Sequence, residues 1–400
     1  MKILMLTPYL PYPPSSGGQV RSYNLIKNLA KRHEITLFSL VKGDEEKKYA
    51  EELTKYCKKV KIFKRPAKPW TLKNILLTGF SLHPFLVIRN LSDEEKKALK
   101  EELEENDYDL IHAENFYVMP HLPSTKIPVL LTEQTILYRV YQHYAESLPW
   151  YLFWLKPILY ADVWKLKREE SKYWKSADFL SAVSQEDKEH ISSLVPGKKI
   201  KIVDNGVDCE YYQKKSYPKD KKPTILFGAA DFHWMQNKEG AKILLDRIWP
   251  RIKEKMPKAR LWIVGKIAPE ALREYSCRQD VTIQEIGDSR EAYQRSWVLL
   301  APMRSGGGSR TKFFEAMASG LPIVTTPEGM EGIPARPGIE AEIHDDLDKL
   351  IEVTVELLTD PAKAKTISEN ARRFVREEYD WSNSAEKLNK LYEEIKSGKN

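Results

Sequence analysis

A glycine run followed by two cations and one acid is the part of this sequence whose residue types and spacing point most directly to chemistry. The stretch reads Ser305-Gly306-Gly307-Gly308-Ser309-Arg310-Thr311-Lys312-Phe313-Phe314-Glu315. Glycines let the backbone approach a ligand closely, and a helix that starts after them presents unpaired N–H groups and a partial positive charge. Arg310 and Lys312 stand where the helix dipole disfavours cations, which predicts an anion such as a diphosphate in front of them. Glu315, one turn further along, can accept hydrogen bonds from hydroxyl groups.

A plain surface turn also explains the three glycines, but it does not explain two cations at the unfavourable end of a helix. The stretch is not a Walker loop, because the G-x-x-x-x-G-K-[ST] spacing is absent. We therefore interpret it as an anion site, with the surface turn as the alternative.

Apolar runs on both sides of this stretch must position it. Residues 297–302 lead into it, residues 321–326 leave it, and Gly320 marks the end of the intervening helix. The chain opens with a similar unit: a strand at residues 2–7, a proline-rich loop, Gly17-Gly18, and a helix from about Gln19 to Lys31. This unit lacks the order of a dinucleotide fingerprint, so its glycine pair is as compatible with a simple turn as with a ligand contact.

Strand patterns alternate with helical patterns along the whole chain, which predicts α/β architecture with parallel sheets covered on both faces. Further strands are expected at residues 34–40, 59–63, 110–113, 128–131, 179–182, 200–203, 224–228, 260–264 and 281–285. Four hundred residues exceed one usual core. We predict two doubly wound, Rossmann-like domains, residues 1–205 and 206–381, which face each other across a cleft. A capping box at Ser92–Glu95 should start a charged helix that ends near Glu105.

Composition narrows the class of protein. The chain is 42% hydrophobic and 30% charged, and its net charge of +7 is spread over 64 basic and 57 acidic residues. This excess is too diffuse to indicate nucleic-acid binding, although it suits an anionic substrate. Cys57, Cys209 and Cys277 have no metal-ligand spacing, so we expect free thiols in a reducing compartment. The start does not resemble a signal peptide, and no uncharged run spans a membrane, so we expect a cytoplasmic protein.

Residues 148–160 are unusually aromatic. Such a run can pack in a core or between domains, and it can also contact a membrane interface or a greasy acceptor. We expect packing, with peripheral contact at the inner membrane face as the alternative.

With these segments in place, the chain resembles the retaining glycosyltransferases of family 4, which have the GT-B architecture, over most of its length. The markers are Gly17-Gly18, Tyr108-Asp109-Leu110-Ile111-His112-Ala113, Val183-Ser184-Gln185, Val203-Asp204-Asn205-Gly206-Val207-Asp208, Phe227-Gly228 with Trp234 and Asn237, and Gly308-Ser309-Arg310-Thr311-Lys312 leading to Glu315-Ala316-Met317-Ala318. The order and spacing of these markers are more specific than any one of them.

The resemblance implies a nucleotide-diphosphate sugar donor held by the C-terminal domain and a glycan or lipid-linked acceptor on the N-terminal one. It implies that Arg310 and Lys312 hold the diphosphate and that Glu315 takes the ribose hydroxyls. It also implies that the last helix, residues 382–396, packs back on the N-terminal domain. The remaining donor contacts that we expect are Gly17, Gly18, Gly228, Asn237, Gly265, Ile286, Gly306, Gly307, Gly308, Ser309 and Thr311. The same-face route attributed to these enzymes needs no carboxylate nucleophile, and we expect neither a metal nor a cofactor.

Two positions depart from the family pattern. The family often carries two glutamates eight residues apart, and here the first falls on Gly307, which leaves sugar contacts to the loop backbone. A histidine often follows the strand at residues 128–131, whereas this chain has Glu133 and Gln134 there. We place Gln134 at the histidine position, where it can hydrogen-bond a sugar but cannot carry a proton. Glu133 is the other candidate for a catalytic role, although a solvated loop acid is the expected role.

Two other features suggest different chemistry. Asp346 and Asp348 match the D-x-D pattern of metal-dependent glycosyltransferases, but they precede a helical pattern, so we interpret them as a helix cap. His112 follows an apolar run, where it can face the cleft or be packed.

The sequence therefore predicts a retaining, metal-independent transferase in polysaccharide, lipid-linked glycan or other glycoconjugate synthesis. The alternatives are a catalytically silent sugar-nucleotide-binding module and, on the same architecture, a phosphorylase or epimerase.

Overall fold

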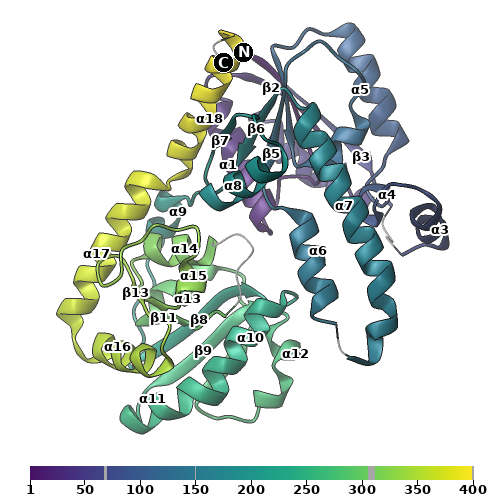
Figure 1. Cartoon of the computed structure of the whole chain (residues 1–400). Helices are drawn as coiled ribbons and strands as arrows, with labels where there is room; N and C mark the ends of the chain where they lie inside the picture. Colours follow the sequence, from purple (N-terminus) through teal and green to yellow (C-terminus); the bar gives the residue numbers. More distant parts are fainter. Residues whose placement is uncertain (67–69, 149, 305–310, 399–400) are drawn as a thin grey trace. The chain divides into compact units, whose positions relative to one another are not determined.

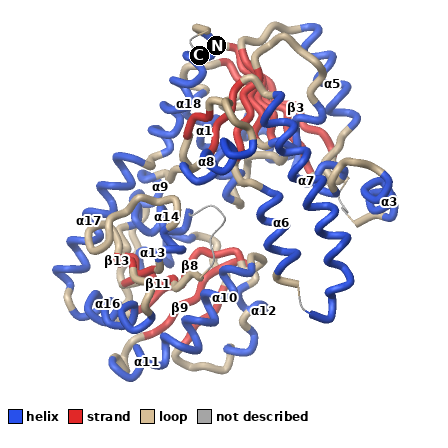
Figure 2. The backbone as a smooth tube through the Cα atoms, viewed as in Figure 1, coloured by secondary structure: helices blue, strands red, loops and turns tan. Residues whose placement is uncertain are grey.

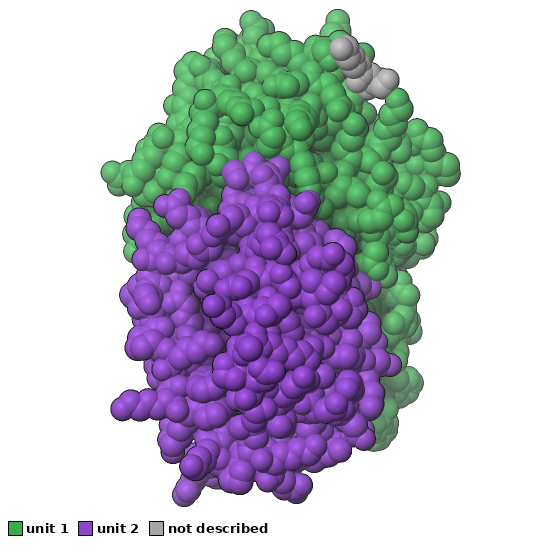
Figure 3. All heavy atoms as spheres, turned by 90° about the vertical axis from the view of Figure 1, so that its left-hand side faces the viewer, with its two compact units in different colours: residues 1–205, 384–400 green, residues 206–383 purple. Residues whose placement is uncertain are grey.

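The structure is a computed structural model that describes residues 1–66, 70–148, 150–304 and 311–398. Its internal contacts divide the chain into two units (Figure 3). Unit 1 comprises Met1–Asn205 and Ser384–Asn400, and unit 2 comprises Gly206–Asn383. Each unit is an α/β body with its own sheet, and each is described by itself below.

Unit 1 contains a seven-stranded parallel sheet in the order β3-β2-β1-β4-β5-β6-β7. The strands are β1 (Lys2–Thr7), β2 (Glu34–Val41), β3 (Lys59–Lys64), β4 (Leu110–Glu114), β5 (Val129–Glu133), β6 (Phe179–Ala182) and β7 (Ile200–Ile202). The central strands are buried on both faces, as expected for apolar runs in a doubly wound sheet. All seven expected strands are confirmed, with ends that shift by one or two residues.

The helices of unit 1 connect these strands (Figure 1). They are α1 (Gly17–Leu29), η1 (Asp44–Tyr49), α2 (Ala50–Leu53), α3 (Leu72–Phe80), α4 (Phe85–Ile88), α5 (Asp93–Glu105), η2 (Phe116–His121), α6 (Leu137–Glu146), η3 (Trp150–Leu155), α7 (Lys156–Ser176) and α8 (Gln185–Leu194). The Ser92 side chain accepts a hydrogen bond from the Glu95 backbone and starts α5, which confirms Ser92 as the N-cap. The reciprocal bond of a capping box is not formed, because the Ser92 backbone N–H donates to His121 Nε2 instead. The start of α1 differs from the expected Gln19, because Gly17 and Gly18 themselves form its first turn.

Unit 2 contains a six-stranded parallel sheet in the order β10-β9-β8-β11-β12-β13. The strands are β8 (Thr224–Asp231), β9 (Arg260–Lys266), β10 (Val281–Gln284), β11 (Val298–Ala301), β12 (Ile323–Thr325) and β13 (Glu342–Ile343). The last of these is only two residues long and was not expected from the sequence, because so short a segment has no periodicity of its own.

The helices of unit 2 lie between these strands and after them (Figure 2). They are α9 (Cys209–Lys214), α10 (Met235–Ile243), η4 (Leu244–Ile248), α11 (Trp249–Lys255), α12 (Ala268–Ala271), η5 (Arg273–Tyr275), α13 (Ser289–Arg295), α14 (Thr311–Ser319), α15 (Pro327–Met330), α16 (Leu347–Thr359) and α17 (Pro361–Glu378).

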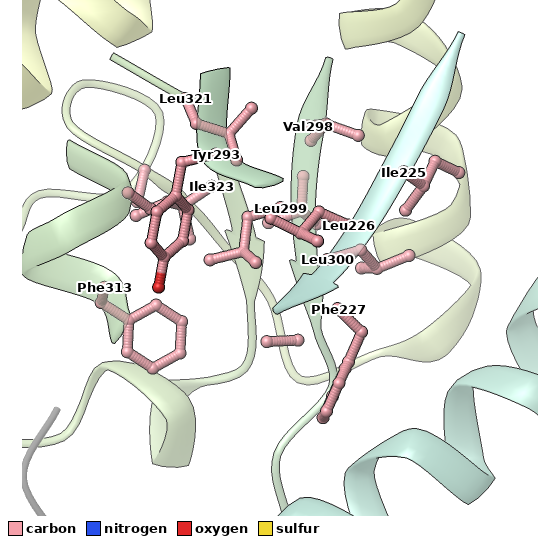
Figure 4. Close-up of a cluster of buried hydrophobic side chains, with 14 of the residues drawn as sticks. Ile225, Leu226, Phe227, Tyr293, Val298, Leu299, Leu300, Phe313, Leu321 and Ile323 are labelled. Carbon is pink, nitrogen blue, oxygen red and sulfur yellow. The ribbon is translucent and has the colours of Figure 1, made fainter. Parts of the chain in front are cut away.

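The hydrophobic core of unit 2 packs directly against α14. Side chains of β8, β11 and β12 pack together there, among them Leu226, Leu299 and Ile323, and Phe313 of α14 joins them (Figure 4). Phe313 is fully buried, so the start of α14 is held against the sheet by hydrophobic packing. The neighbouring residue, Lys312, therefore has a fixed backbone position.

The last helix, α18 (Trp381–Lys396), begins in unit 2 and continues into unit 1. Its expected apolar stripe is buried, and the residues of the stripe are Ala385, Leu388, Leu391 and Tyr392. Within the described ranges, a helix with both the length and the apolar character needed to span a membrane is absent.

The aromatic run at residues 148–160 does not pack in the core of unit 1, which contradicts that part of our expectation, while packing between the domains stays a prediction. Trp150 is 84% exposed, and Phe153 and Trp154 are also exposed on η3. An apolar run has the same composition whether it lies in a core or on a surface, so its exposure is decided by which elements pack beside it.

Candidate functional site

The ammonium group of Lys312 lies at the start of α14, beside Asn237 of α10. Lys312 Nζ donates a hydrogen bond to Asn237 Oδ1 over 3.0 Å. The same Nζ lies 5.3 Å from the ring centre of Phe227 and 5.5 Å from that of Phe313. The structure therefore brings together two of the expected donor contacts, and the aromatic rings orient the cation.

Asn237 is itself held in place, because its Nδ2 donates to the backbone carbonyl of Asp231 over 2.8 Å. Asp231 ends β8, and β8 carries an irregular register against β9 between Phe227 and Ala230. Gly228 lies within this irregularity, and a Cβ there would come 2.6 Å from the Leu226 side chain. Gly265 pairs with Ala230 near the end of β9.

Lys312, Asn237, Gly228 and Gly265 thus lie at or near the carboxyl ends of neighbouring parallel strands. Ligands of open α/β sheets bind at these ends. Ile286 follows β10 and packs partly buried against the core of unit 2, and Thr311 is the first residue of α14. The expected contacts at Gly306, Gly307, Gly308, Ser309 and Arg310 lie outside the described residues.

Glu315 lies one turn after Lys312 on α14 and is held by tyrosines. The Tyr293 hydroxyl donates to Glu315 Oε2 over 2.9 Å. Burial raises the pKa of Glu315 to about 7, and hydrogen bonds from Tyr293 and Tyr212 oppose that rise. A carboxylate held in this way can still accept hydrogen bonds from a ligand, because its two oxygens offer about four acceptor sites.

In unit 1, Gly18 and Gln134 are brought together by Tyr9. The Tyr9 hydroxyl donates to Gln134 Oε1 over 2.6 Å. A Cβ on Gly18 would lie 1.8 Å from the Tyr9 hydroxyl and 2.6 Å from Gln134 Oε1. Only glycine leaves room at this position without displacing these polar groups. Gly17 precedes Gly18 in the first turn of α1.

A buried polar network lies behind Gln134. Gln134 Nε2 donates to Glu114 Oε2, and the same oxygen lies 3.8 Å from Arg21 Nε. The Arg21 guanidinium is 1% exposed and also donates to the Asp204 carbonyl and to Asn205 Oδ1. Glu114 and Gln134 come from the ends of adjacent strands β4 and β5. The charge of Arg21 is therefore balanced inside unit 1, and Gln134 has a fixed orientation.

Glu133 does not have the solvated position that we expected. It is the last residue of β5 and is 1% exposed. Burial, together with the neighbouring carboxyl of Glu170, raises the pKa of Glu133 well above its usual value. Glu133 lies near Glu170 and Trp174 of α7, whereas Gln134, the next residue, contacts Tyr9 and Glu114. This position argues against the proposed catalytic role of Glu133.

His112 is a packed histidine. Its two ring nitrogens lie 2.7 Å from the Tyr392 hydroxyl and 2.7 Å from Thr132 Oγ1. Burial lowers its pKa to about 4, so the ring is neutral near pH 7. The packed alternative holds, since the side chain is fully buried within unit 1.

Asp346 is a helix cap, as expected. Its Oδ1 accepts a hydrogen bond from the Asp348 backbone N–H over 3.1 Å at the start of α16. The Asp348 side chain instead pairs with Arg251. The two carboxylates are therefore engaged by different partners.

Sequence reasoning missed the residues that orient the candidates. They are Tyr9, Arg21, Glu114, Tyr212 and Tyr293, and their partners in these contacts are mostly distant in sequence. Only Glu114 carried a usable signal, because it directly follows the marker that ends at Ala113 and lies at a strand end.

Two family models and one curated relative match parts of this chain. Residues 15–211 match the family model described as "Glycosyltransferase Family 4", and residues 222–360 match the one described as "Glycosyl transferases group 1". One curated relative is similar over 161 residues at 26% identity, a "GDP-mannose-dependent monoacylated alpha-(1-6)-phosphatidylinositol monomannoside mannosyltransferase" of Corynebacterium glutamicum. The match covers 37% of this chain and only 42% of that relative.

Solved structures share the fold over the whole chain. The sucrose-phosphate synthase of Thermosynechococcus elongatus has a TM-score of 0.69 at 16% identity and is covered completely, as is this chain. Anabaena HepE, solved with UDP and glucose, has a TM-score of 0.64 at 15% identity, with 98% of this chain and 99% of HepE covered. The lipopolysaccharide glycosyltransferase WaaG has a TM-score of 0.62 at 17% identity, with 98% and 99% covered. These likenesses confirm the fold class expected from the sequence.

Proposed function

We propose that this chain, whose two halves are glycosyltransferase domains of the GT-B fold, transfers a sugar from a nucleotide-diphosphate sugar to an acceptor hydroxyl. The transfer retains the configuration of the sugar and uses no bound metal. The observation that carries this proposal is the ammonium group of Lys312, held at the start of α14 by Asn237.

The energetics of this position favour an anion as the ligand. A cation at the first turn of a helix costs about 0.3–1 kcal/mol against the helix dipole. A hydrogen bond between Lys312 and a phosphate oxygen contributes about 1.5–3 kcal/mol, which exceeds that cost. Hydrogen bonds from the backbone N–H groups at the start of α14 would add to it.

The leaving diphosphate gains negative charge as the sugar bond breaks. A cation that is already in place stabilises this charge more in the transition state than in the ground state, and so accelerates the reaction. We assign this role to Lys312 and, from the sequence, to Arg310. Glu315, oriented by Tyr293, accepts the ribose hydroxyls.

The N-terminal half supplies positioning rather than proton transfer. Gln134, fixed by Tyr9 and Glu114, has no titrating proton and can only hydrogen-bond a sugar. Glu133 is buried within unit 1. These features support a same-face route without a protein nucleophile, and the contribution of Gly17 and Gly18 to donor binding is part of the same proposal.

The donor and acceptor are proposed by class. The curated relative is named for GDP-mannose and a phosphatidylinositol mannoside, and HepE was solved with UDP. GDP and UDP sugars are therefore the first donors to test, and a glycan or lipid-linked glycan is the proposed acceptor.

Calorimetry with a panel of UDP, GDP and ADP sugars tests the site directly. Lys312→Ala should bind the best donor about 10–100-fold more weakly than the parent, because a charge-assisted hydrogen bond to the diphosphate is lost. Lys258→Ala removes an exposed lysine of the same unit and should bind like the parent. Equal binding by Lys312→Ala and the parent would contradict the site.

Turnover separates the proposal from its alternatives. Release of free nucleotide diphosphate, with sugar transfer or slow donor hydrolysis, is expected and argues against a phosphorylase or an epimerase. Donor binding without any turnover would instead favour a silent sugar-nucleotide-binding module.

A further inference from the structure

An unusually large set of apolar side chains is exposed on one part of unit 1, and we call it the apolar face. It consists of exposed residues on and beside α3, η3 and the first half of α7: Trp70, Leu72, Ile75, Leu76, Leu77, Phe80, Leu82, Trp150, Tyr151, Phe153, Trp154, Ile158, Tyr160 and Trp164. Phe80 is 90% exposed and Trp150 is 84% exposed. Soluble proteins rarely expose so many large apolar side chains together. We therefore expect this face to contact a partner.

The segments of this face, although distant in sequence, are connected. Lys165 Nζ of α7 donates to the Thr78 carbonyl on α3, and the Phe85 backbone N–H donates to Asp162 Oδ1 over 2.9 Å. Arg168 also reaches the Leu82 carbonyl. η3 leads directly into α7, and Figure 1 shows α3 at the margin of unit 1 and α7 packed against α6. These contacts attach the segment that carries α3 to α7, which η3 directly precedes.

The charged residues of these two segments are mostly basic, although the exposed acids Asp93, Glu94 and Glu146 lie next to them in sequence. Residues 70–92 and 150–168 contain six basic residues and a single acid, Asp162. The basic residues are Lys73, Arg89, Lys156, Lys165, Lys167 and Arg168. Asp162 is engaged with the Phe85 backbone, and burial raises its pKa. The excess of positive charge complements an anionic partner.

We propose that the apolar face docks unit 1 on the anionic surface of a lipid bilayer. Tryptophan and tyrosine prefer the boundary between headgroups and acyl chains, and lysine side chains reach from there to lipid phosphates. α3 is nine residues long, so it lies in the plane of the interface and does not cross the bilayer. A second protein copy would bury the aromatic side chains equally well, but it would bring the same positive charges together, which is unfavourable.

This proposal does not depend on the proposed transfer reaction, because it makes no use of the donor site. Flotation of the full-length protein with vesicles, without any nucleotide sugar, therefore tests it separately. The protein should float with vesicles of phosphatidylcholine mixed with phosphatidylglycerol and much less with phosphatidylcholine alone. Binding should weaken as salt increases, because the lipid charge is screened. Equal binding to both vesicle types would overturn the electrostatic part of the proposal.

Two variants and two matched controls locate the contact. The combined substitution Trp150→Ser, Phe153→Ser and Trp154→Ser should lower the vesicle partition coefficient at least about tenfold. Lys73→Glu should lower it several-fold on anionic vesicles only. Ile339→Ser and Lys258→Glu change exposed residues of unit 2 and should bind like the parent. Circular dichroism checks that each variant is folded.

Two further outcomes would overturn the proposal. The first is a parent protein that stays unbound with both vesicle types. The second is a folded aromatic variant that floats as well as the parent. Light scattering without lipid tests whether a second copy of the chain binds this face instead. A dimeric parent and a monomeric aromatic variant would show that it does.

Discussion

The Glu315 carboxyl is a single group whose surroundings set the pH range over which this site should work. Burial raises its pKa to about 7, and the ionised form offers the most acceptor sites to ribose hydroxyls. Binding of hydroxyls stabilises the charged form, so affinity for a nucleotide sugar should rise with pH up to about 7 and then level off. Below pH 7 the loss should approach about tenfold per pH unit, since protonation competes with binding.

Calorimetric titration of the best donor at a series of pH values measures this dependence. Glu315→Gln should bind more weakly at high pH and show a flat pH profile, because an amide does not titrate in this range. Glu270→Gln changes an exposed acid of the same unit and should keep the parental profile. A slope that persists in Glu315→Gln would assign the titration to another group.

Gly18 is the second residue whose role depends on its immediate contacts. An added methyl group would meet the Tyr9 hydroxyl and Gln134. Gly18→Ala should therefore displace both polar groups and lower kcat/KM at least about tenfold, because small misplacements near reacting groups are costly. It should also destabilise the protein by about 1–3 kcal/mol, because overpacking at this position exceeds the gain in helix propensity.

Gly79→Ala is the matched control, because Gly79 also lies in a helix of unit 1 and a methyl group added there would meet open space among the described residues. It should leave activity unchanged. Urea unfolding and steady-state kinetics on both variants provide the comparison. Normal activity of Gly18→Ala would show that the Tyr9–Gln134 contact is not needed for turnover.

At the scale of single elements, α16 tests how we interpreted the two aspartates at its start. Asp346→Ala removes a cap and should destabilise the protein by about 1 kcal/mol. Asp348→Ala removes only an exposed ion pair with Arg251 and should cost less than about 0.5 kcal/mol. Urea unfolding in the presence and absence of Mn²⁺ measures both effects. A stabilisation by Mn²⁺ that either substitution abolishes would favour the metal-binding alternative.

At the scale of the whole molecule, α18 links the two units, because it starts in unit 2 and its residues from Ser384 onward belong to unit 1. Leu388 is fully buried, so Leu388→Ala should destabilise unit 1 by about 2–5 kcal/mol. Lys390→Ala changes an exposed residue on the same helix and should stay within about 0.5 kcal/mol.

Hydrogen exchange during urea unfolding shows which of the two sheets loses stability in Leu388→Ala. Amides of β1 and β4 should lose protection in Leu388→Ala at lower urea concentrations than in the parent, whereas amides of β8 and β11 should keep theirs. Equal losses in both sheets would mean that the two units unfold as one.

Features set by neighbouring residues were predictable from the sequence. The burial of β1 follows from an uninterrupted apolar run, and the starts of α5 and α16 follow from Ser92 and Asp346, whose side chains bond to backbone groups two or three residues away. The fold class followed from the alternation of such elements. These interactions are local, so their pattern is written in consecutive residues.

The tertiary structure decided what depends on residues distant in sequence. Glu133 and Gln134 are adjacent, yet Glu133 is buried near Glu170, whereas Gln134 meets Tyr9 beside Gly18. Which of the two became buried depended on the register of β5 and on the helix packed behind it. The exposure of Trp150 was decided in the same way, since hydrophobicity favours burial but does not specify which apolar run finds a partner.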